Sequence, residues 1–216
     1  DKLGSGVSCI DAAGALGKAK GSDIFYRTDH HWTSLGAFTA YQASASALQF
    51  SPLSREDFTV EDASNEFLGT LYSKTLYNGI PSDTIQLYHY QDDSAVNEVV
   101  VNTGSSKESY DSIYFRDFLE QKDKYSVFLG QNQPVVTIKT NNPNGKKLLV
   151  FKDSYAHCYA QFLIPHYSEI ALVDMRYMSG SYKNYLESSD YDQTLFLYNV
   201  STFTTDNSVQ KLSLAK

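Results

Sequence analysis

The sequence predicts an α/β protein built on a parallel β-sheet, and the main observation is an alternation in its last third. Residues 148–151, 169–174 and 194–199 are apolar runs of strand length, and helix-like segments at 155–164 and 182–187 separate them. Strands joined through helices run parallel with right-handed connections. The second observation is length, because 216 residues suit one domain, or one domain with a large insertion, and bury a sizeable core without disulfides.

The first fifty residues carry weaker periodic signals. In order, we expect a strand over 6–11, a helix over 12–18, a strand over 24–26 and an amphipathic helix over 36–50. Thr33 or Ser34 can cap the second helix at its N-terminus. Pro52 ends it, because proline cannot continue a helix.

The segment from about 52 to 147 differs in character from the rest. We expect strands over 58–61, 84–88, 98–101 and 134–139, with one short helix over 115–121. Because the segment is rich in aromatic residues, we interpret it as a β-rich insertion and not as a linker.

Composition excludes one class of partner and favours another. The net charge is −7 and no basic run appears, which argues against a nucleic-acid surface. The chain has 17 Tyr and 12 Phe, which supply core but also suit surfaces that stack on sugars.

Targeting and cysteine signals are few. No apolar run has membrane-spanning length and no signal peptide is visible. The chain opens on Asp1 without an initiator Met, so we expect a mature or trimmed form from which a targeting segment has been removed. Cys9 and Cys158 lack metal spacing, and Cys158 is predicted to be a buried free thiol.

Two stretches carry the residues from which chemistry is expected. Ser154 follows the apolar run at 148–151 and opens a helix, so the turn exposes its hydroxyl near unpaired backbone N–H groups that can hold an oxyanion. A serine needs a base, and histidine has a suitable proton affinity. Asp29 and His31 point the same way in an extended turn, so the carboxylate can orient the imidazole. Since 154 − 29 = 125 residues separate Asp29 from Ser154, only the fold can bring them together.

Plainer interpretations exist for each stretch. An Asp-Ser pair before a helix is an ordinary N-cap, and Trp32 is most simply a core residue. Asp29-His30-His31 could be half of a metal site in a metal-dependent hydrolase. The other ligands would come from the remaining histidines, His89, His157 and His166, none of which is paired with another donor at metal spacing. The joint occurrence of both stretches on an α/β pattern favours catalysis.

Several motifs resemble one known family. The motifs are Thr28-Asp29-His30-His31-Trp32-Thr33 with Gly36-Ala37, Phe67-Leu68-Gly69-Thr70, Lys122-Asp123-Lys124-Tyr125, Lys152-Asp153-Ser154-Tyr155, Phe162-Leu163, His166-Tyr167, Glu169-Ile170 and Asp174-Met175-Arg176-Tyr177. They resemble the DHHW protein family of Gram-positive bacteria. That family is similar to the SGNH-hydrolase-like domains of alginate and cell-wall polysaccharide O-acetylation proteins, which carry an Asp-x-His-Trp motif before the serine. The resemblance implies a three-layer α/β sandwich.

The resemblance also implies roles for particular residues. Asp29 is the expected orienter, His31 the base and Ser154 the nucleophile. Lys152 departs from ordinary SGNH enzymes, which have glycine before Asp-Ser, and their separate oxyanion blocks are not evident here. Weaker candidates for oxyanion or substrate binding are Asn199, Arg176, Tyr155 and Trp32. Asn199 is equally a core or turn residue, and Arg176 either binds a substrate carboxylate or pairs with an acid.

The predicted organisation is a single SGNH-like domain over residues 1–216, truncated at its N-terminus. The predicted function is that of an extracytoplasmic serine-dependent O-acyl (acetyl) transferase or esterase acting on a cell-surface polysaccharide, with no metal or organic cofactor. Localisation is expected to be secreted or anchored through a segment absent from this chain, and the expected partners are the glycan and a membrane acyl-transfer protein. The alternative is a non-catalytic carbohydrate-binding or scaffold protein that retains the fold.

Overall fold

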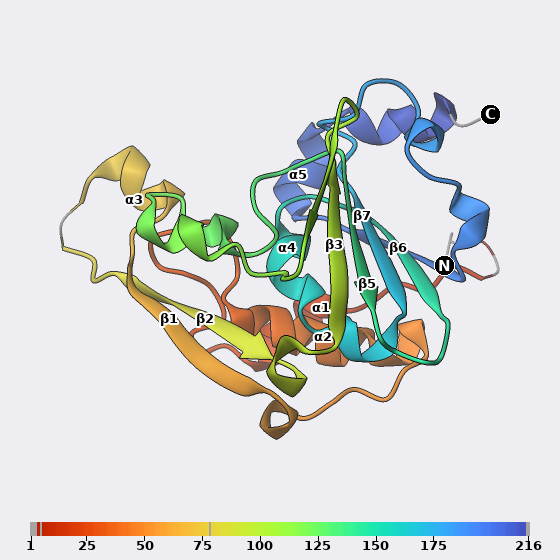
Figure 1. The fold of residues 1–216 in the computed structure, drawn as a ribbon. Helices are drawn as coiled ribbons and strands as arrows, with labels where there is room; N and C mark the ends of the chain where they lie inside the picture. The colour runs from red at the N-terminus through yellow and green to blue at the C-terminus, as the bar shows by residue number, and fades with distance from the viewer. Residues whose placement is uncertain (1–3, 5, 78, 215–216) are drawn as a thin grey trace. The chain divides into compact units, whose positions relative to one another are not determined.

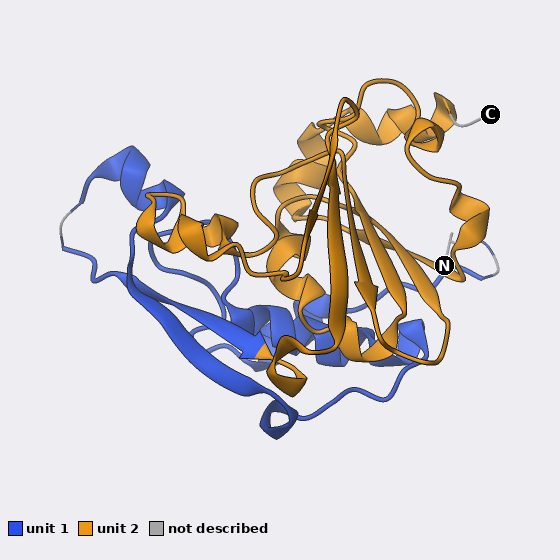
Figure 2. Cartoon of the chain, viewed as in Figure 1, with its two compact units in different colours: residues 1–88 blue, residues 89–216 orange. Residues whose placement is uncertain are grey.

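The computed structural model of the protein describes residues 4, 6–77 and 79–214. The chain divides into two compact units, Asp1–Tyr88 and His89–Lys216, which Figure 2 colours separately. The boundary between them falls inside the segment from 52 to 147 that the sequence marked as an insertion. No helix among the described residues has both the length and the apolar character that crossing a bilayer requires.

Unit 1 combines helices with a small sheet (Figure 1). Its elements are α1 (Ala12–Lys18), α2 (Ser34–Leu48), the 3₁₀ helix η1 (Arg55–Asp57), β1 (Thr59–Phe67), α3 (Thr70–Thr75) and β2 (Asp83–His89). The strands β1 and β2 form a two-stranded sheet, and β2 runs one residue past the boundary. Among the described residues 6–11 there is no strand, contrary to expectation, because Asp11 instead caps α1 by accepting from the Gly14 N–H.

The helix predicted before Pro52 is confirmed as α2. The Thr33 side chain caps it by accepting from the Gly36 N–H, as predicted, and Gln49 closes it in the left-handed conformation. A Cβ at position 36 would lie 2.1 Å from the Ile24 carbonyl oxygen, so glycine allows the helix to start against that backbone. The expected strand over 24–26 is reduced to an isolated bridge between Phe25 and Trp32.

Unit 2 contains a six-stranded sheet with short helices between its strands. Its strands are β3 (Val96–Asn102), β4 (Lys107–Tyr110), β5 (Val135–Thr140), β6 (Lys147–Lys152), β7 (Glu169–Val173) and β8 (Gln193–Leu197). Its helices are α4 (Tyr155–Ala160), α5 (Val200–Thr205) and the 3₁₀ helices η2 (Gln91–Asp93), η3 (Arg116–Glu120), η4 (Lys124–Val127), η5 (Ile164–His166), η6 (Tyr182–Asn184), η7 (Ser188–Asp190) and η8 (Ser208–Leu214).

The sheet is mixed, which corrects the prediction of a parallel sheet. Its order is β4-β3-β5-β7-β6-β8, and only β6 pairs in parallel, with β7 and with β8. The remaining pairs are antiparallel. A hairpin joins β3 to β4, which forces antiparallel pairing, whereas helical crossovers such as α4 allow parallel pairing. Of the four strands expected in an insertion, the last two are β3 and β5 of this main sheet, whereas the first two are β1 and β2 of the small sheet in unit 1.

The carboxyl ends of four strands meet at one edge of this sheet. The strands β3 and β7 both run antiparallel to β5, so β3 points the same way as β7, β6 and β8. In the register of the sheet, Asn102 is opposite Val135, Val135 is opposite Val173 and Val173 is opposite Phe151. Loops that follow β3, β6 and β7 therefore emerge side by side along this edge, in the order of the strands.

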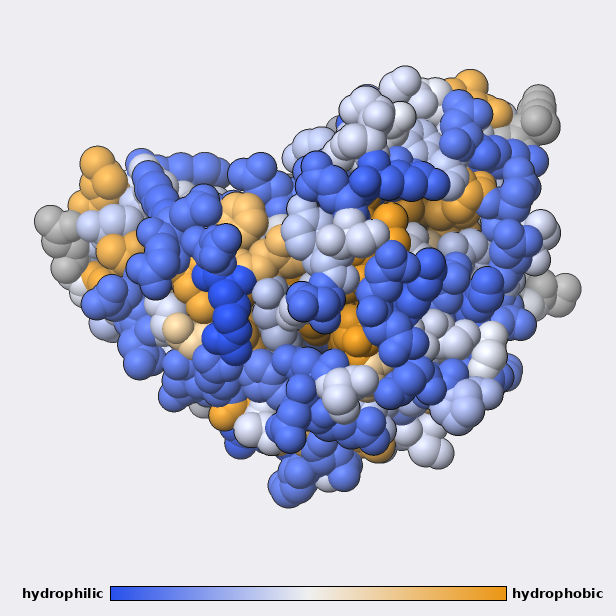
Figure 3. Space-filling view, in the orientation of Figure 1, coloured by the Kyte–Doolittle hydropathy of each residue, from blue (hydrophilic) through white to orange (hydrophobic). Residues whose placement is uncertain are grey.

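The central strands of unit 2 are buried on both faces, as parallel strands usually are. On one face Leu149, Phe151, Ala171 and Val173 join Met175 in an apolar cluster. In the face drawn in Figure 3, hydrophilic residues dominate and hydrophobic residues show in separate groups. The helix predicted to reach residue 164 ends as α4 at Ala160, and Pro165 lies within the following 3₁₀ turn.

Candidate active site

The turn that carries the Asp-His-His sequence is fixed by a buried carboxylate in unit 1. Asp83, at the start of β2, accepts hydrogen bonds from the Thr28 amide at 2.7 Å, the Thr28 hydroxyl at 2.6 Å and the Arg27 amide at 3.0 Å. Since each of these hydrogen bonds restricts the backbone of the turn, Asp83 sets the direction in which the chain continues after Thr28.

Asp29 and His31 form the buried pair that the sequence predicts. The Asp29 carboxylate accepts from the His31 backbone N–H at 3.0 Å, and its Oδ1 lies 2.6 Å from His31 Nδ1. An ionised carboxylate can only accept, so Nδ1 carries the hydrogen and Nε2 carries the lone pair. This is the tautomer that a general base requires.

A second layer of contacts holds the other oxygen of Asp29. Its Oδ2 accepts from the Thr70 amide and the Thr70 hydroxyl, each at 2.8 Å. A Cβ at Gly69 would lie 2.3 Å from the Asp29 Cβ, so only glycine fits beside the carboxylate. Burial alone would raise the pKa of Asp29, but side-chain hydrogen bonds from His30 and His31, the His31 charge and the Thr70 amide outweigh it. The pKa therefore lies well below its usual range, and Asp29 stays ionised.

His30 is exposed, and its ring lies against that of His31, with 3.9 Å between the ring centres and an interplanar angle of 38°. Its Nδ1 lies 2.7 Å from the Thr70 hydroxyl oxygen and 3.6 Å from Asp29 Oδ1. The donor atoms of Asp29, His30 and His31 lie within 4.8 Å of one another, so the three residues could in geometry hold a metal ion. Both Asp29 oxygens and His31 Nδ1 already make hydrogen bonds, and a metal would have to replace some of them.

Ser154 lies in unit 2, at the turn from β6 into α4. It occupies the N-cap position, yet its side chain makes no capping hydrogen bond. Of the Asp-Ser pair, it is the Asp153 side chain that bonds to a backbone N–H at the start of α4. From Leu148 to Ile164 every residue is buried except Ser154, which is partly exposed. The turn thus presents one hydroxyl from an otherwise buried segment.

Asp153 holds this turn in shape from beneath. One carboxylate oxygen accepts from the Tyr155 amide at 3.0 Å, and the other accepts from the Asn199 amide at 2.8 Å. Asp153 is buried and links the turn after β6 to the turn after β8. The Tyr155 amide and the Ala156 amide both bond to Asp153, so neither supplies the oxyanion donors that the sequence led us to expect from this helix.

Lys152 is fully buried, at 0% exposure, and three partners surround its ammonium group. Its Nζ lies 2.6 Å from His157 Nε2, 3.1 Å from Asp174 Oδ2 and 3.1 Å from Asn132 Oδ1. The His157 Nδ1 lies 3.0 Å from the Phe128 carbonyl oxygen and donates to it, since Nε2 accepts from the lysine. The network joins β6, α4 and the end of β7 directly behind the Ser154 turn.

Two cations in this network share one carboxylate. Burial lowers the pKa of Lys152 to about 8, against the opposing effect of Asp174. Burial would raise the pKa of Asp174, but Arg176 and Lys152 together lower it below its usual value. The Arg176 guanidinium donates to both carboxylate oxygens of Asp174, at 2.9 and 2.7 Å. The region behind Ser154 is therefore an ion cluster with one acid between two cations.

The weaker candidates have structural roles. Arg176 pairs with an acid, Asp174, which is one of the two roles expected for it. Asn199 caps α5 by accepting from the Ser201 amide at 2.8 Å, which gives its side chain the role of a turn residue. Trp32 and Tyr155 are buried, at 6% and 7% exposure, so both belong to the core. Cys158 is a buried free thiol, as predicted.

Four residues contribute to these two clusters without having been predicted from the sequence to do so: Gly69, Thr70, Asp83 and Lys152. Thr70 and Gly69 were noticed only as part of a motif, and Asp83 gave no signal because it precedes an ordinary strand. Lys152 was noticed as a departure from glycine, but a lysine at a strand end usually reaches solvent. The one sequence signal that Lys152 could be buried was that its neighbours on both sides belong to segments predicted to be buried.

The mixed sheet and its helices define an α/β protein, in which unit 1 holds a buried Asp-His pair and a strand-to-helix turn of unit 2 presents a serine. Residues 14–173, most of the chain, match the family described as DHHW protein. The chain therefore belongs to the DHHW protein family.

Solved structures resemble this fold. A DHHW family protein from Eubacterium siraeum is 27% identical with a TM-score of 0.78, and the match covers 94% of this chain and 68% of that one. PatB1 from Bacillus cereus with a sulfonyl adduct is 20% identical with a TM-score of 0.75, covering 100% of this chain and 74% of that one. A second PatB1 structure is 22% identical with a TM-score of 0.65, covering 83% and 63%. Curated protein sequences give no match.

Proposed function

We propose that this protein is a serine-dependent O-acetyltransferase or esterase that acts on a cell-surface polysaccharide outside the cytoplasm. The Asp29–His31 hydrogen bond carries the proposal, because it gives the imidazole the tautomer of a base. The Ser154 turn supplies a matching nucleophile, since its hydroxyl is withheld from capping α4. In this proposal His31 is the base and Ser154 the nucleophile of the same reaction.

The reaction proceeds in two balanced steps. The Ser154 oxygen attacks the carbonyl carbon of an acetyl donor while His31 Nε2 takes the hydroxyl proton, and the leaving group departs with that proton. The acetyl group is now an ester of Ser154. A sugar hydroxyl or a water molecule then attacks this ester, His31 accepts its proton and returns it to the Ser154 oxygen, and the enzyme is restored.

The comparisons support this proposal at the level of fold and family. One of the two PatB1 structures carries a sulfonyl adduct, and sulfonyl groups form such adducts on nucleophilic side chains. A membrane-bound acetyl donor protein and anchoring through a segment outside residues 1–216 are parts of the same proposal. Neither a metal ion nor an organic cofactor is needed for the steps described.

The deciding experiment measures acetate release from 4-nitrophenyl acetate by the unchanged protein and by Ser154→Ala and His31→Ala. Each variant should lose at least about 1,000-fold in kcat/KM, because triad members act as a unit. Ser189→Ala, an exposed serine in η7, is the matched control and should retain full activity. Activity unchanged by EDTA would separate this function from metal-dependent hydrolysis on Asp29, His30 and His31.

A transferase that excludes water needs a second readout. Phenylmethanesulfonyl fluoride should add one sulfonyl group to the protein, detected by intact mass, and the adduct should be absent from Ser154→Ala and slow to form on His31→Ala. Absence of both ester cleavage and sulfonylation in the unchanged protein would reject the enzyme. The non-catalytic carbohydrate-binding or scaffold function would then stand in its place.

A further inference from the structure

A polar hollow of about 330 Å³ lies in unit 2 beside the hairpin between β3 and β4. Six residues line it: Asn102, Gly104, Lys107, Ser179, Asn184 and Tyr185. They come from two segments far apart in sequence, the hairpin and the loop after β7. None of the six is acidic, and they offer amide, ammonium, hydroxyl and phenol groups to a ligand.

The hollow has a fixed wall. The Asn102 side chain accepts from the Gly104 amide at 3.0 Å, and Gly104 adopts a φ of +89°, which favours glycine. A Cβ at Gly104 would lie 2.8 Å from the Tyr185 hydroxyl oxygen, so the tyrosine packs directly on this backbone. The same hydroxyl accepts from the Ser179 amide at 3.4 Å. Tyr185 therefore joins the hairpin to the loop after β7, and no rearrangement is needed to open the hollow.

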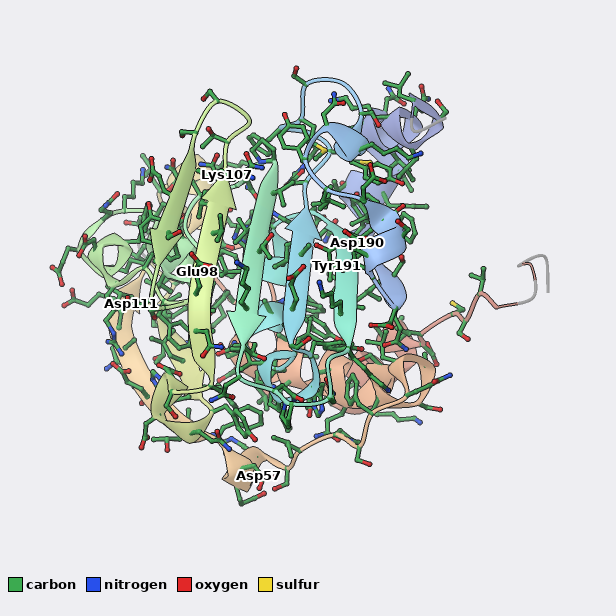
Figure 4. All side chains as sticks on the ribbon, turned by 45° about the vertical axis from the view of Figure 1, so that its right-hand side comes forward. Asp57, Glu98, Lys107, Asp111, Asp190 and Tyr191 are labelled. Carbon is green, nitrogen blue, oxygen red and sulfur yellow. The ribbon has the colours of Figure 1, made fainter. Side chains whose placement is uncertain are left out.

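The strand register of the sheet gives the position of the hollow relative to Ser154. Asn102 is aligned with Phe151 across β5 and β7, so the hollow lies at the same edge as the Ser154 turn. Three strand spacings separate β3 from β6, which is roughly 14 Å. Figure 4 shows Lys107 at this end of the sheet. The loop after β7 lies between the hollow and Ser154 in the order of the strands. In this loop Tyr177 is half exposed, and the Arg176 guanidinium lies over its ring, 5.5 Å from the ring centre.

We propose that this hollow is a binding subsite for a sugar residue of a glycan whose acetylated or acceptor residue lies at Ser154. A hydroxyl-rich ligand needs several donors and acceptors in one place, which Asn102, Asn184, Ser179 and Tyr185 provide beside the Lys107 ammonium group. A short oligosaccharide can span the distance along the sheet edge, passing Tyr177. The inference rests on the proposed function, because it assumes that the substrate of Ser154 is a glycan.

The test compares two double variants with the unchanged protein. Lys107→Ala with Asn184→Ala removes two exposed groups of the hollow, whereas Lys122→Ala with Asn207→Ala removes one exposed lysine and one exposed asparagine that do not line it. Binding is measured on an array of purified bacterial surface polysaccharides, and 4-nitrophenyl acetate cleavage is measured in parallel. The hollow variant should bind its polysaccharide about tenfold more weakly, from the loss of two hydrogen-bonding groups. The control variant should bind as the unchanged protein does.

Small-ester cleavage should be unchanged in the hollow variant, since 4-nitrophenyl acetate is too short to reach it. Equal glycan binding by the two double variants, or no bound polysaccharide on the array, would overturn the subsite. If Ser154-dependent cleavage persists in that case, the proposed chemistry survives and only the subsite fails. Hollow-dependent glycan binding without Ser154-dependent chemistry would instead reject the enzyme and keep the subsite.

Discussion

At the scale of single residues, the Asp29 carboxylate has more partners than a structural turn needs. It accepts from His31 through one oxygen and from Thr70 through the other, so both its position and its ionisation are determined. Such a carboxylate holds the imidazole in one orientation and stabilises the positive charge that a base acquires. The function of His31 should therefore depend on Thr70 through the two hydrogen bonds that Thr70 donates to Asp29.

Replacement of Thr70 by valine tests this dependence. Thr70→Val keeps the shape and the amide bond but removes the hydroxyl bonds to Asp29 Oδ2 and His30 Nδ1. We therefore expect kcat/KM to fall about tenfold and stability by about 1 kcal/mol. Thr70→Ser should restore activity, because it restores the hydroxyl. Thr75→Val, in the same helix, removes a hydroxyl that bonds only to backbone carbonyls and should leave kcat/KM unchanged. Full activity in Thr70→Val would show that the Thr70 amide alone positions Asp29.

Sequence spacing predicts part of this residue cluster. The i and i+2 positions of Asp29 and His31 in an extended turn placed both side chains on one side, and the structure confirms their contact. The partners Thr70 and Asp83 lie about forty and fifty-five positions away, at |i−j| of 41 and 55. Contacts at that range depend on the path of β1 and β2, which no local pattern specifies.

At the scale of elements, Lys152 ties β6, α4 and the end of β7 together behind the nucleophile turn. A buried lysine costs free energy unless its charge is compensated, and Asp174 and His157 compensate it here only in part. Burial lowers the pKa of Lys152 from 10.5 to about 8 in the folded protein. This shift links the stability of the whole fold to pH.

The sign of that linkage can be tested with Lys152→Met. Between pH 8 and 10.5 the unfolded chain keeps a proton on Lys152 that the folded protein releases, so this group makes stability rise with pH. Its contribution across the window is about 3 kcal/mol. In urea unfolding from pH 7 to 10, the unchanged protein should gain stability relative to Lys152→Met as pH rises. Lys146→Met, at an exposed lysine, should follow the unchanged protein, and identical pH slopes for all three would refute the linkage.

The elements divide by how local their signals are. The three strands β6, β7 and β8 and the helix α2 follow from apolar runs and a capping threonine, and the sequence predicts all four. The strand β4 is exposed along its length, so no burial pattern marks it. The position of β5 between β3 and β7 depends on antiparallel pairing across long loops, which makes the sheet mixed where periodicity alone predicted parallel strands.

At the scale of the whole molecule, the residues proposed for catalysis belong to different compact units. Asp29 and His31 lie in unit 1, and Ser154 lies in unit 2, with the boundary after Tyr88. The strand β2 crosses that boundary by one residue, so the connection between the units is short. Whether the proposed catalytic residues act within one chain or between two chains is therefore part of what has to be tested.

Mixing two inactive variants distinguishes a site within one chain from a site shared between chains. We expect His31→Ala and Ser154→Ala to remain inactive when mixed, because each intact half would be paired with a damaged half of its own chain. Unfolding the two proteins together in urea and refolding them should give the same result. If activity returned, up to the quarter of sites that random exchange between two chains allows, unit 1 of one molecule would be serving unit 2 of another. The catalytic unit would then be a dimer, and the connection at residue 88 would be its hinge.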